Sequence, residues 1–210
     1  WIIICIWYFF NNRAIEGSKQ VNLKDGIIQM LLFKTVVLIG MMGSGKTSVG
    51  KILSTALDVP LADTDAEISK DANSTISEIF DRDGEVKFRQ AETRIIRRLL
   101  QGPPCVVSTG GGAFLNEQNR KIIAKFGVSV LLKVDRELLW ERVRRKNTRP
   151  LLKTTSPRET LFKILDSRQD IYNLSDLTVQ SDKESTIAET ANAVIDLLVK
   201  RPDVLNSVGD

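Results

Sequence analysis

A glycine-rich stretch with one lysine, GMMGSGKTS at residues 40–48, carries the clearest chemical signal in the sequence. Residues 40–47 match the pattern G-x-x-x-x-G-K-[ST] at each fixed position. Such a loop turns successive backbone N–H groups toward phosphate oxygens, and the following helix adds the positive end of its dipole. An apolar run precedes the stretch and a helical pattern follows it, which disfavours a plain glycine-rich turn. We therefore expect a triphosphate site made by Gly43, Ser44, Gly45, Lys46, Thr47 and Ser48.

A phosphate loop of this kind usually works with an acidic residue that helps to hold Mg²⁺ beside the threonine hydroxyl. The apolar run at 105–109 would often end in that acid, but here it ends in Ser108 and Thr109. Asp63 and Asp65 are the remaining candidates, and we expect them to project from one face at the end of a strand at 59–65. One could hold a metal-bound water while the other accepts a proton or hydrogen bond from the substrate. The alternative is two solvated turn acids, because D-T-D is also a common turn sequence.

Composition is that of an ordinary globular protein, with 210 residues, 42% hydrophobic and 27% charged. A net charge of +4 suits an anionic ligand or nucleic acid and does not decide between them. The chain has no histidine, which excludes Ser-His hydrolases and zinc sites built from histidine. Cys5 and Cys105 lie far apart and form no metal-type or redox pair, which favours a reducing cytoplasmic setting.

Apolar runs that read as strands alternate with helical patterns along the chain. The strands are expected at 34–40, 59–65, 105–109, 128–134 and 176–180, and the helices at 46–57, 66–101, 117–126, 136–146, 158–173 and 186–200. The long helical stretch should break near Asn73 and Gly84. This alternation predicts a three-layer α/β sandwich around a five-stranded parallel sheet. Ligands bind beyond the carboxyl ends of such strands, and the phosphate loop, the two aspartates and a triple glycine all fall there.

The first ten residues, WIIICIWYFF, are strongly apolar but too few to span a membrane as a helix. No basic stretch precedes them, as a signal peptide would require. We expect residues 1–30 to be an extension outside the fold or the product of a misplaced start, and residues 31–210 to form a single domain. A membrane-attaching tail is the alternative, and without it no membrane association is expected.

Taken together, these motifs resemble the shikimate kinase family of P-loop kinases over residues 34–200. The resemblance rests on GMMGSGKTSVGK, DTDAEI, ISEIFDRDGEVKFRQAE, STGGGA, TRPLL and the pair Arg168 and Tyr172. The phosphate loop alone is shared by many activities, whereas F-R-x-x-E after D-x-D, followed by G-G-G and R-P-L-L, is far more specific. Asn73 departs from the glycine that the family often has there, although asparagine tolerates the left-handed conformation. The resemblance implies Mg²⁺- and ATP-dependent phosphorylation of the 3-hydroxyl of shikimate, in chorismate biosynthesis.

The resemblance also implies which residues bind the acceptor. Arg89 and Arg168 would clamp the shikimate carboxylate, and Glu92 would orient Arg89. A planar guanidinium suits a carboxylate, and the i,i+3 spacing of Arg89 and Glu92 lets them pair on a helix. Without the family, a surface ion pair of little consequence is the alternative. The substrate-binding region would span about residues 63–93.

The ring and hydroxyls of the acceptor would be met by other residues of the same motifs. Asp65 would bind the hydroxyls and act as the base or orient the attacking oxygen. The glycines Gly110, Gly111 and Gly112 would let the backbone approach the ring, with Gly111 donating its N–H. Phe80 and Phe88 would pack against the ring, although composition alone favours a place in the core for both.

On the donor side, the resemblance implies that Asp63 holds Mg²⁺ through water and that Arg149 closes over the ATP phosphates. Arg142 is expected to stack on adenine, and the loop around Ser181 to line the adenine pocket. A mobile lid would cover about residues 142–155. Its arginines and lysine could instead form a nucleic-acid patch, but aromatic residues are not interleaved with them. We expect a cytoplasmic monomer that binds ATP and shikimate and no nucleic acid.

Two rival functions remain at this point. One is a small-molecule kinase of the nucleoside-monophosphate-kinase type, acting on a nucleotide or on gluconate. The other is a nucleotide sensor or partner-binding module without catalysis, which would have no evident reason to keep both aspartates, both arginines and the triple glycine together.

Overall fold

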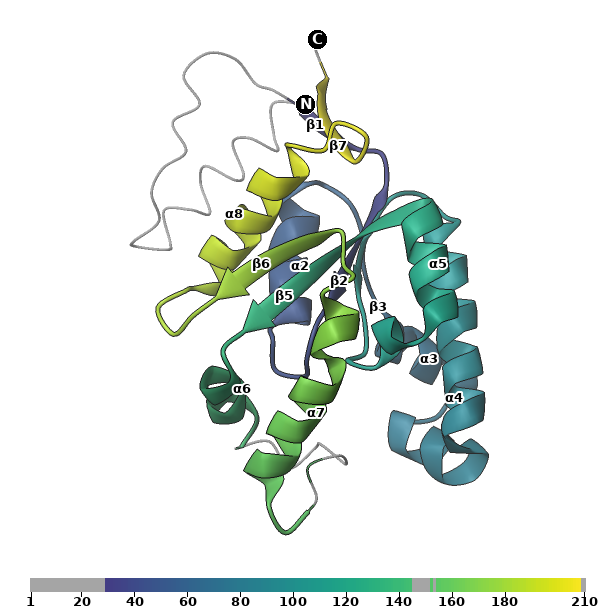
Figure 1. The fold of residues 1–210 in the computed structure, drawn as a ribbon. Helices are drawn as coiled ribbons and strands as arrows, with labels where there is room; N and C mark the ends of the chain where they lie inside the picture. Colours follow the sequence, from purple (N-terminus) through teal and green to yellow (C-terminus); the bar gives the residue numbers. More distant parts are fainter. Residues whose placement is uncertain (1–28, 145–151, 153, 209–210) are drawn as a thin grey trace.

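The computed structural model describes residues 29–144, 152 and 154–208. Its centre is a parallel sheet of five strands in the order β3-β4-β2-β5-β6, with helices on both faces (Figure 1). The strands are β2 (Thr35–Ile39), β3 (Leu61–Asp63), β4 (Val106–Ser108), β5 (Gly127–Val134) and β6 (Leu177–Ser181). The predicted three-layer α/β architecture is therefore confirmed, and each of its strands overlaps a predicted one.

The helices follow the predicted periodicity closely. They are α2 (Lys46–Ala56), α3 (Thr64–Ala72), α4 (Ile76–Leu100), α5 (Glu117–Phe126), α6 (Arg136–Val143), α7 (Pro157–Tyr172) and α8 (Ile187–Leu198), with a 3-10 turn η2 (Ala113–Leu115). Both predicted breaks in the long helical stretch are present. Asn73 adopts the left-handed conformation at φ 46°, and Gly84 has non-helical angles of φ 76° and ψ 172° within α4.

The sheet separates two hydrophobic cores, because the side chains of a parallel strand alternate between its two faces. Val36 and Leu38 of β2 pack with α2 and α8 on one face, and Val37 and Ile39 pack with α4 and α5 on the other. These four side chains are completely buried. The continuous apolar character of the run at 34–40 is thus explained by burial on both sides.

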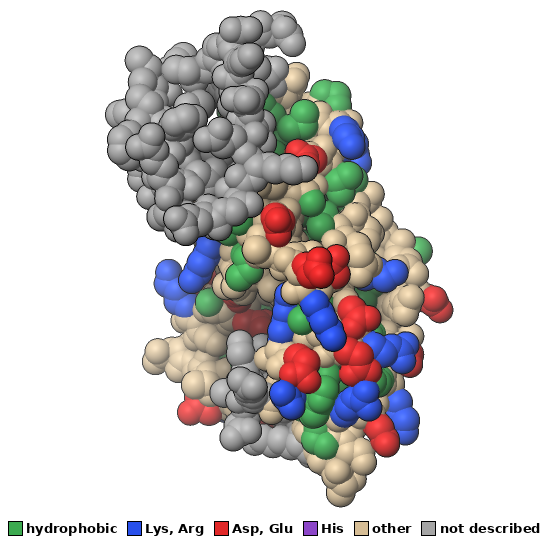
Figure 2. Space-filling model, turned by 90° about the vertical axis from the view of Figure 1, so that its left-hand side faces the viewer, with side chains coloured by type: hydrophobic (Ala, Val, Ile, Leu, Met, Phe, Trp, Pro, Cys, Tyr) green, Lys and Arg blue, Asp and Glu red, His purple; other side chains and the backbone are tan. Residues whose placement is uncertain are grey.

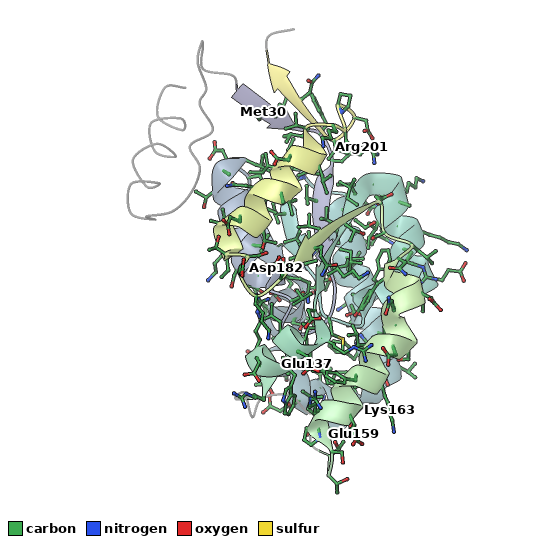
Figure 3. All side chains as sticks on the ribbon, turned by 60° about the vertical axis from the view of Figure 1, so that its left-hand side comes forward. Met30, Glu137, Glu159, Lys163, Asp182 and Arg201 are labelled. Atoms are coloured by element: carbon green, nitrogen blue, oxygen red, sulfur yellow. The ribbon has the colours of Figure 1, made fainter. Side chains whose placement is uncertain are left out.

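A second, two-stranded antiparallel sheet was not predicted. It pairs β1 (Gln29–Leu32) with β7 (Leu205–Val208), so that Leu32 lies opposite Leu205. Figure 3 shows Met30 and Arg201 at the same end of the molecule. β1 begins two residues before the domain start expected at about residue 31, and residues 1–28 lie outside the described residues.

The strand predicted at 59–65 is shorter than expected, and this changes the account of its two acids. β3 ends at Asp63, and Asp65 belongs to the first turn of α3. Asp63 is the N-cap of α3, because its Oδ1 accepts from the backbone N–H groups of Asp65 and Ala66 at 3.1 and 3.4 Å. The two aspartates therefore do not share one face of a strand. A strand-to-helix turn brings them to the same end of the sheet instead.

At that end of the sheet, α6 lies beside α7, and Figure 3 shows Glu137 of α6 near Glu159 of α7. A bond of 2.7 Å from Arg158 Nη2 to Glu137 Oε1 joins the two helices. Most of the predicted lid lies outside the described residues, including Arg149.

Acidic and basic side chains are interspersed on the face drawn in Figure 2. Within the described part of the chain, none of the helices combines the length and the apolar character needed to cross a membrane.

Candidate active site

The phosphate loop leaves β2 and enters α2 directly. All three of its glycines, Gly40, Gly43 and Gly45, have positive φ angles of 135°, 84° and 95°. Gly45 is the N-cap of α2 in the left-handed region, which side chains rarely adopt. The described loop thus has the backbone of an anion-binding turn at the start of a helix, as the sequence pattern predicts.

Lys46 is folded back onto this loop. Its Nζ donates to the carbonyl oxygens of Gly40 and Met41, both at 2.9 Å, and contacts Ser44 Oγ at 3.4 Å. Only 8% of the residue is exposed. The ammonium group is therefore held inside the turn of the loop, where a nucleotide phosphate would be enclosed. Ser48, in the first turn of α2, is exposed.

The threonine hydroxyl at the start of α2 lies between two polar side chains. Thr47 Oγ1 is 3.1 Å from Asp63 Oδ2 and 3.1 Å from Ser108 Oγ at the end of β4. One carboxylate and one hydroxyl beside a phosphate loop fit Mg²⁺, which takes few protein ligands and completes its shell with phosphate oxygens and water. Ser108 stands at the strand end where an acid is commonly found, and it was not among the predicted site residues.

The triple glycine is the point at which the other predicted residues meet. A Cβ built on Gly110 would lie 2.8 Å from Asp65 Oδ1 and 3.3 Å from Glu92 Oε1, and one on Gly112 would lie 2.6 Å from Arg89 Nη2. Side chains at these two positions would displace a carboxylate and a guanidinium group. The absence of Cβ atoms therefore lets Asp65 and Arg89 reach the backbone of this loop.

Arg89 binds two glutamates on its own helix. Its Nη1 donates to Glu92 Oε2 at 3.0 Å, while Nε and Nη2 donate to Glu85 Oε1 at 3.3 and 3.2 Å. The Glu92 side chain is completely buried, whereas that of Glu85 is 68% exposed. Burial raises the pKa of Glu92, against the opposing attraction of Arg89. Desolvation disfavours the charged form of Arg89, but its pairing with the two glutamates outweighs this and raises its pKa.

Arg168 and Tyr172 lie one turn apart on α7, and both donate to the carbonyl oxygen of Gly111. The distances are 3.3 Å from Arg168 Nη1 and 2.5 Å from Tyr172 Oη. A Cβ on Gly111 would also lie 3.4 Å from the backbone nitrogen of Met42 and 3.6 Å from the carbonyl oxygen of Gly40. The triple glycine therefore touches the phosphate loop on one side and the arginine of α7 on the other.

Phe80 and Phe88 stack with ring centroids 4.5 Å apart, in a small core formed by α3 and α4. Phe88 is 4% exposed, and the guanidinium carbon of Arg89 lies 5.2 Å from its ring centroid. Phe80 is only half-buried. Both therefore pack in a core, as composition alone favoured, and Phe80 also keeps a surface that a ligand could touch.

Of the two residues expected near adenine, Arg142 lies at the phosphate loop and Ser181 is buried between β6 and α8. Arg142 Nη1 lies 3.4 Å from the carbonyl oxygen of Gly43, so its side chain reaches the phosphate loop. The Ser181 hydroxyl is buried and bonds Thr190 Oγ1 at 3.1 Å. This hydroxyl joins β6 to α8, so only the loop that follows Ser181 is left as a candidate for the adenine pocket. Arg149 lies outside the described residues.

Three residues of this site were missed by reasoning from the sequence: Glu85, Ser108 and Tyr172. Glu85 could have been found, because it precedes Arg89 by four residues on a helix. Ser108 was recognised only as a residue at the strand end where an acidic residue is often found, and no contact was predicted for it. Tyr172 was part of the motif carrying the family resemblance, but nothing in its local sequence indicates a contact with Gly111.

The chain is similar to known proteins of one family. The family model described as shikimate kinase matches residues 42–199. A shikimate kinase of Ruegeria pomeroyi is 55% identical over 191 residues, covering 91% of this chain and 97% of the relative. One from Cereibacter sphaeroides is 51% identical over 193 residues, covering 91% and 96%. The solved structure of an Acinetobacter baumannii shikimate kinase in complex with shikimate superposes with a TM-score of 0.75 at 32% identity, covering 80% of this chain and 94% of that one. The chain belongs to the shikimate kinase family.

Proposed function

We propose that this protein transfers the γ-phosphoryl group of ATP to the 3-hydroxyl of shikimate, giving shikimate 3-phosphate and ADP for chorismate biosynthesis. Membership of the family supports the reaction. One observation supports it most strongly: the triple glycine lies next to Asp65, Arg89 and the phosphate loop, and it accepts a hydrogen bond from Arg168. A donor site and an acceptor site are thus joined by three residues of backbone.

The acceptor is held by charge and by hydrogen bonds. Arg89 and Arg168 bind the carboxylate of shikimate, because a guanidinium group presents paired N–H donors to a carboxylate. Glu92 fixes the orientation of Arg89 through the 3.0 Å bond to Nη1. Gly111 donates its N–H to the acceptor, and Phe80 and Phe88 support the ring.

Asp65 either accepts the proton of the attacking hydroxyl or orients that hydroxyl toward phosphorus. Its carboxylate lies at Gly110, next to the contact between Gly111 and the phosphate loop. Phosphoryl transfer depends mainly on alignment and charge stabilisation. Lys46 supplies positive charge from the donor side, and Arg149 adds to it on closure of the lid at about 142–155.

The residues beside Thr47 fit a magnesium ion that arrives with the nucleotide. Thr47 and Asp63 would hold it, Asp63 through a water molecule. When bound, the ion neutralises negative charge on the transferring phosphoryl group. Ser108 keeps the Thr47 hydroxyl in place through the 3.1 Å contact between the two oxygens.

The kinase domain spans about residues 31–210, with the acceptor region at about 63–93. Arg142 and the loop after Ser181 bind adenine in this proposal. The protein acts as a cytoplasmic monomer on two small molecules, ATP and shikimate, and not on nucleic acid.

The direct test is an assay of the purified protein with Mg²⁺ and ATP. We expect ADP release that depends on shikimate, and phosphorus NMR should identify shikimate 3-phosphate. Gluconate and nucleoside monophosphates serve as competing acceptors. The proposal fails if folded protein releases no ADP with shikimate, or if another acceptor gives a higher kcat/KM. Binding of ATP without turnover on any acceptor would instead indicate a nucleotide sensor.

A further inference from the structure

We propose that Glu85 is an exchangeable counter-ion of Arg89, which occupies the carboxylate-binding edge of its guanidinium group until the substrate carboxylate displaces it. The inference rests on the proposed function, since it assumes that Arg89 receives the acceptor carboxylate. In this proposal Glu85, which precedes Phe88 and Arg89 in the chain, competes with the substrate carboxylate for Arg89.

The two glutamates use different edges of the same guanidinium group. Glu92 bonds Nη1, and Glu85 bonds Nε and Nη2 with a single oxygen, Oε1. The Nε and Nη2 pair is an edge on which two parallel hydrogen bonds to a carboxylate can form. A Cβ built on Gly112 would lie 2.6 Å from Nη2 and 2.8 Å from Nη1, so both terminal nitrogens of Arg89 face the triple glycine. Glu85 therefore occupies one of the two terminal nitrogens that face the triple glycine, and Glu92 occupies the other.

The contacts of Glu85 are the weaker of the two sets. Its distances of 3.2 and 3.3 Å are slightly longer than the 3.0 Å of Glu92, and all three exceed the usual 2.7–2.9 Å of a charge-assisted bond. Its side chain is 68% exposed, and water screens such a pair strongly. Glu92, by contrast, is completely buried and bonds at 3.0 Å. Glu92 is thus the permanent partner of Arg89, and Glu85 is the partner that can leave.

A displaced Glu85 side chain can move into a solvent-filled groove beside α4. Glu85 and Arg89 both line a surface groove of about 640 Å³, whose lining also includes Arg94 and Arg97. A displaced carboxylate therefore stays near positive charge and in contact with water. Gly84 interrupts α4 directly before Glu85, with φ 76° and ψ 172°, so Glu85 begins the second half of this helix.

Exchange implies that Glu85 weakens substrate binding, which a purely structural residue would not do. A substrate carboxylate must first break the contacts of Glu85 with Arg89. Removing the charge of Glu85 should therefore lower the KM for shikimate, by about two- to fivefold for an exposed ion pair. A role in merely orienting Arg89 predicts the opposite sign, because losing an orienting partner raises KM.

The test compares the wild type with Glu85→Gln and Glu85→Ala in the shikimate assay. Both variants should show a lower KM for shikimate and an unchanged KM for ATP. The methyl ester of shikimate, which lacks the anionic carboxylate, provides a second arm. Its kcat/KM should not improve in either variant, because a neutral ester does not compete with Glu85 for Arg89.

Asp196→Asn is the matched control, because Asp196 is exposed on α8, outside the acceptor region, and its loss changes the net charge equally. It should leave the KM for shikimate unchanged. An unchanged or higher KM in both Glu85 variants would overturn the exchange while leaving the proposed function intact. An equal fall in the KM for shikimate in Asp196→Asn, or an equal gain in kcat/KM with the methyl ester, would also overturn it. If the wild type has no turnover with shikimate, the proposed function falls and the exchange falls with it.

Discussion

Arg89 and Glu92 lie one turn apart on α4 and meet at 3.0 Å, with the glutamate carboxylate completely buried. Among the described residues, Glu92 Oε1 accepts no hydrogen bond. The pair thus combines one good contact with the cost of a buried charge. Such a pair is better explained by the need to hold Arg89 in one orientation than by stability.

Glu92→Gln should therefore weaken the binding of shikimate. The amide keeps the shape and one acceptor but loses the charge that holds Arg89, so the KM for shikimate should rise by about tenfold. The KM for ATP should not change, because Glu92 acts through its bond to Arg89 on the acceptor side. Steady-state kinetics with each substrate varied in turn checks this. An unchanged KM for shikimate would contradict the orienting role.

The same substitution should also change how the free energy of unfolding depends on pH. Because burial raises the folded-state pKa of Glu92, the folded state binds more protons than the unfolded state above the unfolded pKa of about 4.3. Its contribution to stability is thus complete below that pH and falls as pH rises through the folded pKa. Gln cannot ionise, so the variant does not lose stability in this way. The difference between its free energy of unfolding and that of the wild type should therefore shift in favour of the variant as pH rises from about 4 toward 8. Denaturant titrations of both proteins across this range measure the difference.

Lys46→Met should abolish most turnover. Lys46 is the cation held within the phosphate loop, bonded to two loop carbonyls at 2.9 Å. We expect kcat to fall by about 10²-fold or more, since charge stabilisation of the transferring phosphoryl group is lost. Lys51→Met, the same change at an exposed position of α2, is the control and should keep near-normal kcat. Comparable activity of the two variants would remove the role given to Lys46.

Asp63→Asn tests the magnesium site. Asparagine can still cap α3 through its side-chain oxygen, so folding should be retained, but the charge beside Thr47 is lost. The Mg²⁺ concentration for half-maximal activity should rise by about tenfold or more. Asp135→Asn, which changes the N-cap of α6 in the same way, should leave the Mg²⁺ dependence as it is. Chelation of Mg²⁺ should stop turnover in all three proteins.

Tyr172→Phe removes one hydrogen bond at the triple glycine and little packing. Tyr172 donates to the Gly111 carbonyl at 2.5 Å, and Arg168 donates to the same oxygen at 3.3 Å. Without the tyrosine hydroxyl this carbonyl depends on Arg168, which is then held away from the acceptor. The KM for shikimate should rise by about two- to tenfold at an unchanged KM for ATP. A rise in both KM values would indicate general loosening of the site instead.

Leu205→Ala tests whether the two-stranded sheet belongs to the cooperative fold. Leu205 is 1% exposed and packs in the core with α2 and α8. Its truncation should lower the free energy of unfolding by about 2–5 kcal/mol, measured by denaturant titration. Leu31→Ala is the control, because Leu31 lies in β1 but is 46% exposed, and its effect should stay within about 0.5 kcal/mol. Equal effects would show that β7 packs less tightly than described.

Sequence alone determined the elements that depend on local pattern. The burial of β2 follows from its unbroken apolar run, and the breaks at Asn73 and Gly84 follow from residues that accept left-handed or non-helical backbone. The phosphate loop was read from eight consecutive residues. Parallel connection of the strands then brought their carboxyl ends to one edge, which predicted where the candidate site lies but not its contacts.

Tertiary structure alone decided what depends on residues far apart in the chain. Thr47 meets Ser108 across 61 positions, Tyr172 meets Gly111 across 61, and β1 pairs with β7 from opposite ends of the described chain. It also moved Asp65 from the predicted strand into the first turn of α3. Local propensity carries no information about such pairings, because they are set by how the layers pack. The side chains that surround a predicted site residue are therefore known only once the chain is folded.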